Sequence, residues 1–248
     1  MFPSQSKIKR QIYHLINVHQ MSEAAIRPHF FLTGPSGSGK SFLTKQVCQS
    51  LEIPFFEVNA AQLTAEGLSG NSLSKAMRPL REHWNTPNVC FVDEFDKLFQ
   101  RNGEQTENFR SIVQDEFLHV LEAKNASIFT DYGKYEPIKV ENTMFIFAGA
   151  FSGQKIESID ELKAAGLRTE FVGRVPLVFA TTQVTLPEMY TALPKTDLFN
   201  QYLRVYPEIR KTDALREIKK IMESQAKQAD IGVRLISSAT HQFFMKDV

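Results

Sequence analysis

Apolar residues recur along this chain in two patterns, a helical spacing and short unbroken runs. Between residues 5 and 19, Ile8, Ile12 and Ile16 return at every fourth position, which is typical of a helix with one buried face. The short runs are typical of strands. Predicted strands lie at 30–32, 54–58, 88–94, 143–150 and 175–180, and predicted helices at 5–19, 41–50 and 107–122. This alternation predicts a doubly wound α/β fold with a parallel sheet.

Three further segments complete the predicted pattern of helices and turns. A helical stripe runs from Leu73 to Trp84, and Pro79 inside it predicts a kink or an early break. Residues 132–135 indicate a turn. From Pro187 onward only helical spacing remains. We therefore expect an α/β domain over residues 1–183 and a small helical domain over residues 184–248.

The composition narrows the possible partners. Of the 248 residues, 42% are hydrophobic, and no apolar run approaches the roughly 20 residues that a membrane helix needs. The net charge of +1 gives no whole-chain attraction for nucleic acid, and basic patches such as residues 7–10 fit solvated helix faces. Cys48 and Cys90 lie in apolar segments, so we expect them to be reduced and buried. These features predict a cytoplasmic protein without a membrane partner.

A glycine-rich segment, residues 34–41, lies between the first predicted strand and a predicted helix. Its pattern G-x-x-x-x-G-K-S lets backbone N–H groups and a helix N-terminus converge on phosphate oxygens. Lys40 is then expected to reach the β- and γ-phosphates, and the Ser41 hydroxyl to reach Mg²⁺. A Gly/Ser-rich surface turn is the alternative, but the flanking strand and helix favour a phosphate-binding loop.

Two acids, Asp93 and Glu94, end the apolar run that begins at residue 88. Ligands of α/β sheets bind at the C-terminal ends of the strands, so Asp93 is expected to hold Mg²⁺ and Glu94 to polarise an attacking water. Acids at a strand end also occur as plain solubilising residues. The phosphate-binding loop upstream favours the catalytic interpretation.

Five segments together resemble the motifs of the AAA+ ATPases, and within them those of the ClpX and HslU type of protein unfoldase. They are residues 34–41 (similar to Walker A), 89–98 (Walker B), 143–151 (a strand ending G-A-F), 170–176 (an E-F-I-G-R-L-P box) and 231–235 (a G-A-R sensor-2 motif). The box at 170–176, which reads E-F-V-G-R-V-P, is the most distinctive match. The segments span nearly the whole chain in the family's order.

The resemblance implies an ATP hydrolase that forms a homo-oligomeric ring, a hexamer, and uses ATP and Mg²⁺. Arg174 would reach the γ-phosphate held by the neighbouring subunit, and Arg234 would clamp the phosphates from the helical domain of its own subunit. An arginine after a glycine turn or at a helix start is otherwise an ordinary surface charge. The implied nucleotide-binding residues are Gly34, Pro35, Ser36, Gly37, Ser38, Gly39, Lys40, Ser41, Phe42 and Arg234. The implied metal ligands are Ser41 and Asp93, and the implied catalytic residues are Lys40, Glu94 and Arg174.

Three features depart from the family pattern. The pore loop G-Y-V-G is matched by residues 67–70, G-L-S-G, so Leu68 stands where the family has a gripping aromatic ring. The zinc domain of ClpX-type proteins has no match. Their long peptidase-docking insertion has none either, because only residues 152–169 separate the G-A-F box from the E-F-V-G-R box. We therefore expect a compact form without a peptidase partner. Small residues around Gly149 replace the polar sensor-1 side chain, whose role could pass to Ser152 or to a water.

The expected function is therefore a ring-forming, Mg²⁺-dependent ATPase that remodels or unfolds a protein client. A rival from another class is a nucleic-acid-associated ATPase, such as a helicase loader or DNA motor, because the pore loop lacks the aromatic. The near-neutral charge disfavours that rival. A small-molecule P-loop kinase or a GTPase would explain Lys40 but neither Arg174 nor Arg234.

Overall fold

A computed structural model describes residues 2–64, 70–99, 104–130, 133–226 and 232–246. The chain divides into two compact units. The sheet unit comprises Ile8–Gly34 and Lys40–Ala180, and the helical unit comprises Met1–Lys7, Pro35–Gly39 and Thr181–Val248. Each unit is described by itself below. The expected domain boundary between residues 183 and 184 stays a prediction.

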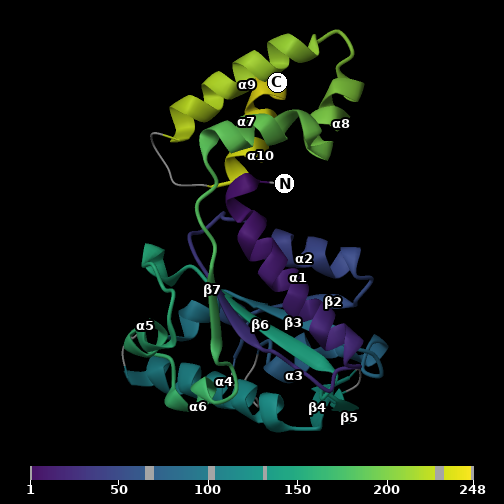
Figure 1. Ribbon diagram of the computed structural model, residues 1–248, viewed down its shortest axis with the longest axis vertical. Helices are drawn as coiled ribbons and strands as arrows, with labels where there is room; N and C mark the ends of the chain where they lie inside the picture. Colours follow the sequence, from purple (N-terminus) through teal and green to yellow (C-terminus); the bar gives the residue numbers. More distant parts are fainter. Residues whose placement is uncertain (1, 65–69, 100–103, 131–132, 227–231, 247–248) are drawn as a thin grey trace. The chain divides into compact units, whose positions relative to one another are not determined.

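In the described part of the sheet unit, five parallel strands form one sheet in the order β2-β3-β6-β1-β7 (Figure 1). The strands are β1 (Phe30–Thr33), β2 (Phe55–Asn59), β3 (Asn88–Asp93), β6 (Thr143–Gly149) and β7 (Leu177–Ala180). The central strand β6 pairs with β1 on one side and β3 on the other. Because all the strands run parallel, their C-terminal ends share one edge. The predicted α/β fold with a parallel sheet is confirmed.

Helices cover both faces of this sheet, because alternate residues of a strand point to opposite faces. Phe30 and Leu32 of β1 pack on one face with α1 (Ser6–Met21) and α2 (Lys40–Ser50). Phe31, between them in the sequence, packs on the other face. The α-helices that contribute to the core on that face include α3 (Leu73–Ala76), α4 (Glu104–Glu122), α5 (Ile159–Ala164) and α6 (Thr169–Val172).

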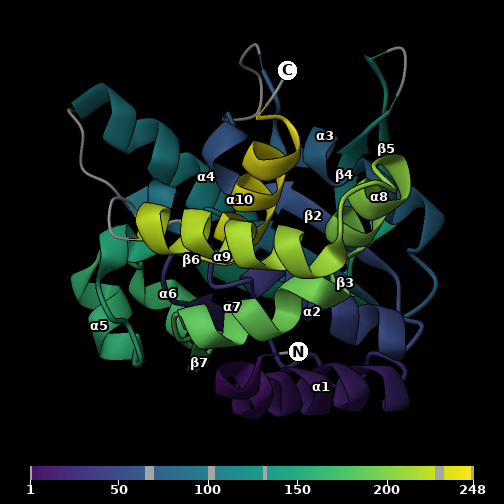
Figure 2. The same cartoon turned by 90° about the horizontal axis from the view of Figure 1, so that it is seen from above.

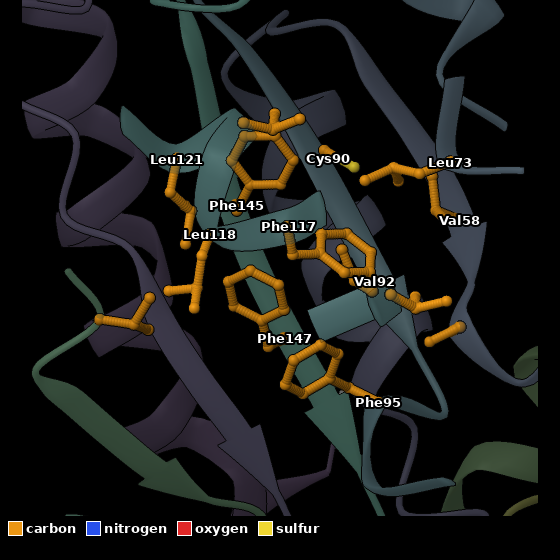
Figure 3. Close-up of a cluster of buried hydrophobic side chains, with 14 of the residues drawn as sticks. Val58, Leu73, Cys90, Val92, Phe95, Phe117, Leu118, Leu121, Phe145 and Phe147 are labelled. Carbon is orange, nitrogen blue, oxygen red and sulfur yellow. The ribbon is translucent and has the colours of Figure 1, made fainter. Parts of the chain in front are cut away.

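An aromatic cluster fills the core under α4 (Figure 3). The ring centroids of Phe95 and Phe147 lie 4.6 Å apart, and Phe117 of α4 packs edge-on against both rings at 5.6 Å. Such ring pairs stabilise a core beyond the area that they bury. Phe95 directly follows Glu94 in the sequence, so the turn that carries the two acids is anchored in the core.

Several elements differ from the expected pattern. An antiparallel hairpin, β4 (Asn125–Phe129) and β5 (Tyr135–Lys139), was not predicted, because its strands show only weak apolar alternation. The helix α4 begins at Glu104, before the expected residue 107. The break predicted near Pro79 is confirmed: α3 ends at Ala76 and a separate 3₁₀ helix, η3 (Arg78–Glu82), follows.

The helical unit has a core of its own. Its helices are α7 (Leu186–Ala192), α8 (Asp197–Val205), α9 (Lys211–Ala226) and α10 (Arg234–Phe244), and α10 packs across α9 (Figure 2). Phe199, Ile218 and Ala239 are fully buried between them. At the start of α7, Thr185 and Glu188 form a capping box that satisfies free backbone N–H groups. The predicted helical character of this segment is confirmed.

The two cysteines are free and buried, as expected. Burial raises the pKa of the Cys48 thiol to about 12 and that of Cys90 well above its usual value, so both thiols stay protonated. None of the helices in the described ranges has the length and apolar character needed to cross a membrane. The cytoplasmic location stays a prediction.

Candidate functional site

The glycine-rich segment forms a loop between β1, which ends at Thr33, and α2, which begins at Lys40. Gly34, Gly37 and Gly39 adopt φ values of 129°, 69° and 83°. Backbone with positive φ is open to glycine and strained for most other residues, so these three glycines allow the tight path of the loop. The loop ends at the N-terminus of an 11-residue helix, whose free N–H groups favour anions.

Lys40 folds back toward the beginning of the loop. Its Nζ donates a hydrogen bond to the carbonyl oxygen of Gly34 at 2.7 Å, and the residue is only 9% exposed. The ammonium group is thereby held beside the loop rather than in open solvent. Ser41 is half-buried in the first turn of α2, and Phe42 is 60% exposed on the same turn. The segment thus joins a strand to a helix, and the roles predicted for Lys40, Ser41 and Phe42 stay predictions.

The middle of the loop, Pro35–Gly39, belongs to the helical unit and contacts other segments of that unit that lie far away in the sequence. The hydroxyl groups of Ser38 and Thr181 share a hydrogen bond of 2.7 Å, and the N–H of Val233 donates to the carbonyl oxygen of Gly37 at 2.8 Å. A Cβ atom at Gly232 would lie 2.4 Å from that same oxygen. The glycine before Val233 therefore permits a close approach that any side chain would prevent.

The two acids lie at the C-terminal edge of the sheet, where β1 also ends. Asp93 is the last residue of β3 and is half-buried, whereas Glu94 is exposed. Glu94 has a φ of 56°, which is uncommon for a residue other than glycine, and its N–H donates to Asp93 Oδ1 at 2.9 Å. Such backbone strain concentrates at functional sites. Together with Gly34 and Lys40, the acids place oxygen donors and a cation at one edge of the sheet.

A third carboxylate, Asp96, was not predicted as a site residue. Its side chain is buried and accepts hydrogen bonds from the N–H groups of Ala150, at 3.3 Å, and Phe151, at 3.1 Å. A Cβ atom at Gly149 would lie 2.8 Å from Asp96 Oδ1. Gly149 therefore leaves the space at the end of β6 to this carboxylate. Ser152, the alternative that the sequence offered for a polar group here, is exposed.

Arg174 is presented at the surface by buried neighbours. Phe171 and Val175 on either side of it are fully buried, and its own backbone N–H donates to the Phe171 carbonyl at 3.0 Å. Its guanidinium pairs with the carboxylate of Glu122 on α4 and donates to the carbonyl oxygen of Glu170. In the described part of the chain, its side-chain partners are thus in α4 and α6 rather than in the loop or the acid turn.

Of the two remaining predicted residues, the structure describes Arg234 but not Leu68. Arg234 is the first residue of α10 in the helical unit and is exposed. Leu68, the predicted client contact, lies outside the residues that the structure describes. Neither Thr181 nor Asp96 was predicted as a contact of the site, because their partners are distant in the sequence.

Comparison with known proteins identifies a family and a set of relatives. Residues 30–188 match the family described as "ATPase family associated with various cellular activities (AAA)". The chain is similar to the ATP-binding subunit ClpX of the ATP-dependent Clp protease from Treponema denticola, at 28% identity over 188 residues, which cover 69% of this chain and 44% of the relative. It is 25% identical over 228 residues to the subunit from Bacteroides thetaiotaomicron, covering 73% and 55%. For the subunit ClpX 2 of Wolinella succinogenes the identity is 27% over 222 residues, covering 71% and 54%. The chain spans about half the length of these curated relatives.

Proposed function

Because the chain belongs to the AAA family of ATPases and has the P-loop with which they hydrolyse ATP, we propose that it uses this hydrolysis to remodel a protein client in a ring of identical subunits. The observation that carries the proposal is the arrangement at the sheet edge. Lys40 lies against Gly34 at the end of β1, and Asp93 and Glu94 lie at the end of β3. This is the pairing of phosphate-binding loop and strand-end acids that phosphoryl transfer to water requires.

The residues present suit a magnesium nucleotide. The Ser41 hydroxyl and the Asp93 carboxylate are hard oxygen donors of the kind that Mg²⁺ prefers. The described residues contain no group of three or more His, Cys, Asp or Glu side chains that could hold a metal alone. Mg²⁺ commonly binds through one or two protein ligands together with phosphates, which agrees with this sparse set. When bound, the ion neutralises charge that develops on the phosphates.

Within one subunit the roles divide between binding and hydrolysis. Lys40 and the loop amides bind the β- and γ-phosphates, and Glu94 orients and polarises the attacking water. The exposure of Glu94 leaves its carboxylate accessible to water, and the bond from its N–H to Asp93 ties the two acids together. Phe42 and Arg234 add contacts to the nucleotide.

We test the division of roles with Lys40→Ala and Glu94→Gln. Lys40→Ala should abolish ATP binding, because it removes a contact made in the ground state. Glu94→Gln should bind ATP normally and lose turnover by roughly two orders of magnitude or more, since it removes only the activation of water. Nucleotide titration and phosphate release measure the two effects. An equal loss of ATP affinity in both variants would contradict the assignment.

Arg174 is proposed to act on the nucleotide of the neighbouring subunit. To do so its guanidinium must leave Glu122, which is exposed and therefore holds it only weakly. If Arg174 acts in trans, mixing Arg174→Ala subunits with Lys40→Ala subunits should restore part of the ATPase activity, because some interfaces then combine an intact loop with an intact arginine. Absence of recovery in rings proven to contain both variants would place Arg174 in cis.

The client is proposed to be a protein, because the similar subunits belong to an ATP-dependent protease. No peptidase partner is proposed, and Leu68 is proposed as the residue that contacts the client. A pull-down with Glu94→Gln should retain the client, since blocked hydrolysis keeps the ring closed on it. Stimulation of the ATPase by an unfolded protein would support the proposal. Stimulation by DNA with a steep dependence on salt would favour the nucleic-acid alternative.

A further inference from the structure

The phosphate-binding loop is covered by Gln5, a residue that no motif includes. Gln5 ends the 3₁₀ helix η1 (Pro3–Gln5) and is only 4% exposed. Its Nε2 donates a hydrogen bond to the carbonyl oxygen of Ser38. The same nitrogen lies 3.8 Å from the place that a Cβ atom would take at Gly39. Gln5 therefore lies against the peptide group that joins Ser38 to Gly39.

The neighbouring peptide group is held in the same way. The carbonyl oxygen of Gly37 accepts the N–H of Val233 at 2.8 Å, and the hydroxyl of Ser38 bonds to that of Thr181. Gln5, Thr181 and Val233 all belong to the helical unit, as do these loop residues. The consecutive carbonyl oxygens of Gly37 and Ser38 thus accept from donors outside the loop.

The direction of a carbonyl group determines the direction of the next N–H group. A trans peptide group holds its C=O and N–H on opposite sides, so a Ser38 carbonyl that faces Gln5 turns the Gly39 N–H to the other side of the loop. Loops of this kind bind phosphate through their N–H groups. If the peptide group rotated, a carbonyl oxygen would face the phosphates and repel them.

We propose that Gln5 is a positioning residue of the phosphate-binding loop. Its donated hydrogen bond selects the loop conformation in which the Gly39 N–H is available to phosphate oxygens. Gln5 therefore acts on nucleotide affinity through Ser38, without contact with the phosphates. This inference rests on the proposed function, because it requires that nucleotide binds at the loop.

The test compares two glutamines of the same kind. Gln5→Met keeps the length of the side chain and removes the donor. The matched control is Gln20→Met, because Gln20 also donates through Nε2 to a backbone carbonyl, that of Leu51 at 2.8 Å, away from the loop. Titration with ADP should show a loss of affinity of roughly threefold to tenfold for Gln5→Met, the worth of one hydrogen bond, and none for Gln20→Met. At saturating ATP the kcat of Gln5→Met should equal that of the wild type, with a raised KM.

Each outcome decides between the alternatives. If the wild type binds ADP, and Gln5→Met and Gln20→Met bind it with equal affinity, the proposed role of Gln5 is overturned. Failure of the wild type itself to bind ADP or ATP would instead overturn the proposed function. If Gln5→Met does not fold, Gln5→Leu serves as the second variant, since it also lacks the donor and adds no charge beside the loop. It should lower ADP affinity as well, and unchanged affinity in Gln5→Leu would contradict the inference.

Discussion

Two turns that each follow a buried strand are held in place by different parts of the chain. The acid turn after β3 is held within the sheet unit: Phe95 is in the aromatic core, and Asp96 accepts N–H groups at the end of the neighbouring strand β6. The middle of the loop after β1, Pro35–Gly39, is itself part of the helical unit and is held by other residues of that unit, among them Thr181 and Val233. One turn depends on core packing, and the other on a few hydrogen bonds to remote segments.

This difference in how the two turns are held separates the residues proposed for hydrolysis from those proposed for phosphate binding. The residues proposed for hydrolysis are placed by the same packing that stabilises the sheet. The residues proposed for phosphate binding are placed by contacts whose loss leaves the sheet core intact. Substitutions around the loop should therefore change nucleotide affinity alone, whereas substitutions around the acid turn should change turnover and stability together.

The largest effect on this comparison is expected from Gly232→Ala. A Cβ atom there would lie 2.4 Å from the Gly37 carbonyl oxygen, and the residue has a φ of 60°. Overlap and strain of this kind cost about 1–3 kcal/mol, so ADP affinity should fall roughly tenfold to a hundredfold if the loop yields. The matched control is Gly133→Ala, because Gly133 has a φ of 72° and, among the described residues other than its chain neighbours, no atom within 4 Å of its Cβ position. ADP titration of both variants measures the effect, and equal affinities would show that the contact with Gly37 does not set the loop.

Gly149→Ala is expected to lower turnover and folding stability, and to leave ADP affinity unchanged. Its Cβ would lie 2.8 Å from both Asp96 Oδ1 and a ring carbon of Phe151, so the carboxylate must move away from the N–H groups at the end of β6. Overpacking of this kind costs about 1–3 kcal/mol of folding stability. The unfolding midpoint in urea and the turnover number should both fall while ADP affinity stays close to that of the wild type. A loss of ADP affinity as large as that of Gly232→Ala would remove the distinction between the two turns.

The smallest effect is a difference in acid sensitivity between the units. Burial, with Arg27 and His19 nearby, lowers the pKa of His29 in the sheet unit to about 3. In the helical unit desolvation raises the pKa of Glu188, but hydrogen bonds from Ser4 and Thr185 outweigh it and lower the pKa to about 2. Unfolded histidine takes up a proton below about pH 6.5, and unfolded glutamate only below about pH 4.5. The sheet unit should therefore begin to lose stability near pH 6.5 and the helical unit near pH 4.5.

This difference can be measured separately in each unit. Trp84, the single tryptophan of the sequence, reports unfolding of the sheet unit, and amide hydrogen exchange in α7 and α9 reports the helical unit. His29→Gln should flatten the decline of the sheet unit between pH 6.5 and 5, where His19, whose pKa burial also lowers, contributes the remainder. The stabilisation from charged Glu188 is fully present above about pH 4.5. Glu188→Gln should therefore lower the stability of the helical unit at neutral pH and flatten its further decline below about pH 4.5. Identical pH profiles for the two units would show that they do not unfold independently.

Much of the site was predictable because its residues are adjacent in the sequence. The glycines of the loop, Lys40 and the acid pair form short patterns that place them at the ends of a strand or a helix, and they lie there. Their chemical roles stay predictions. The contacts that hold these residues were not predictable. Ser38 and Thr181 are separated by 143 residues, and Gln5 and Ser38 by 33, so no local pattern relates them. The proposed roles of Arg174 and Arg234 stay predictions.

The sequence by itself determined the parallel α/β fold, the helical character beyond residue 187 and the positions of the phosphate loop and the strand-end acids. These depend on residue type and spacing within a few positions, which periodicity and backbone preference govern. Only the tertiary structure showed which donors bind the carbonyl groups of the loop. It also showed that Gly149 and Gly232 lie where a side chain would overlap atoms of another segment. A Cβ atom at Gly149 would lie 2.8 Å from Asp96 Oδ1, and one at Gly232 would lie 2.4 Å from the carbonyl oxygen of Gly37. These contacts join residues that are far apart in the sequence, so they depend on tertiary packing and leave no local pattern from which to predict them.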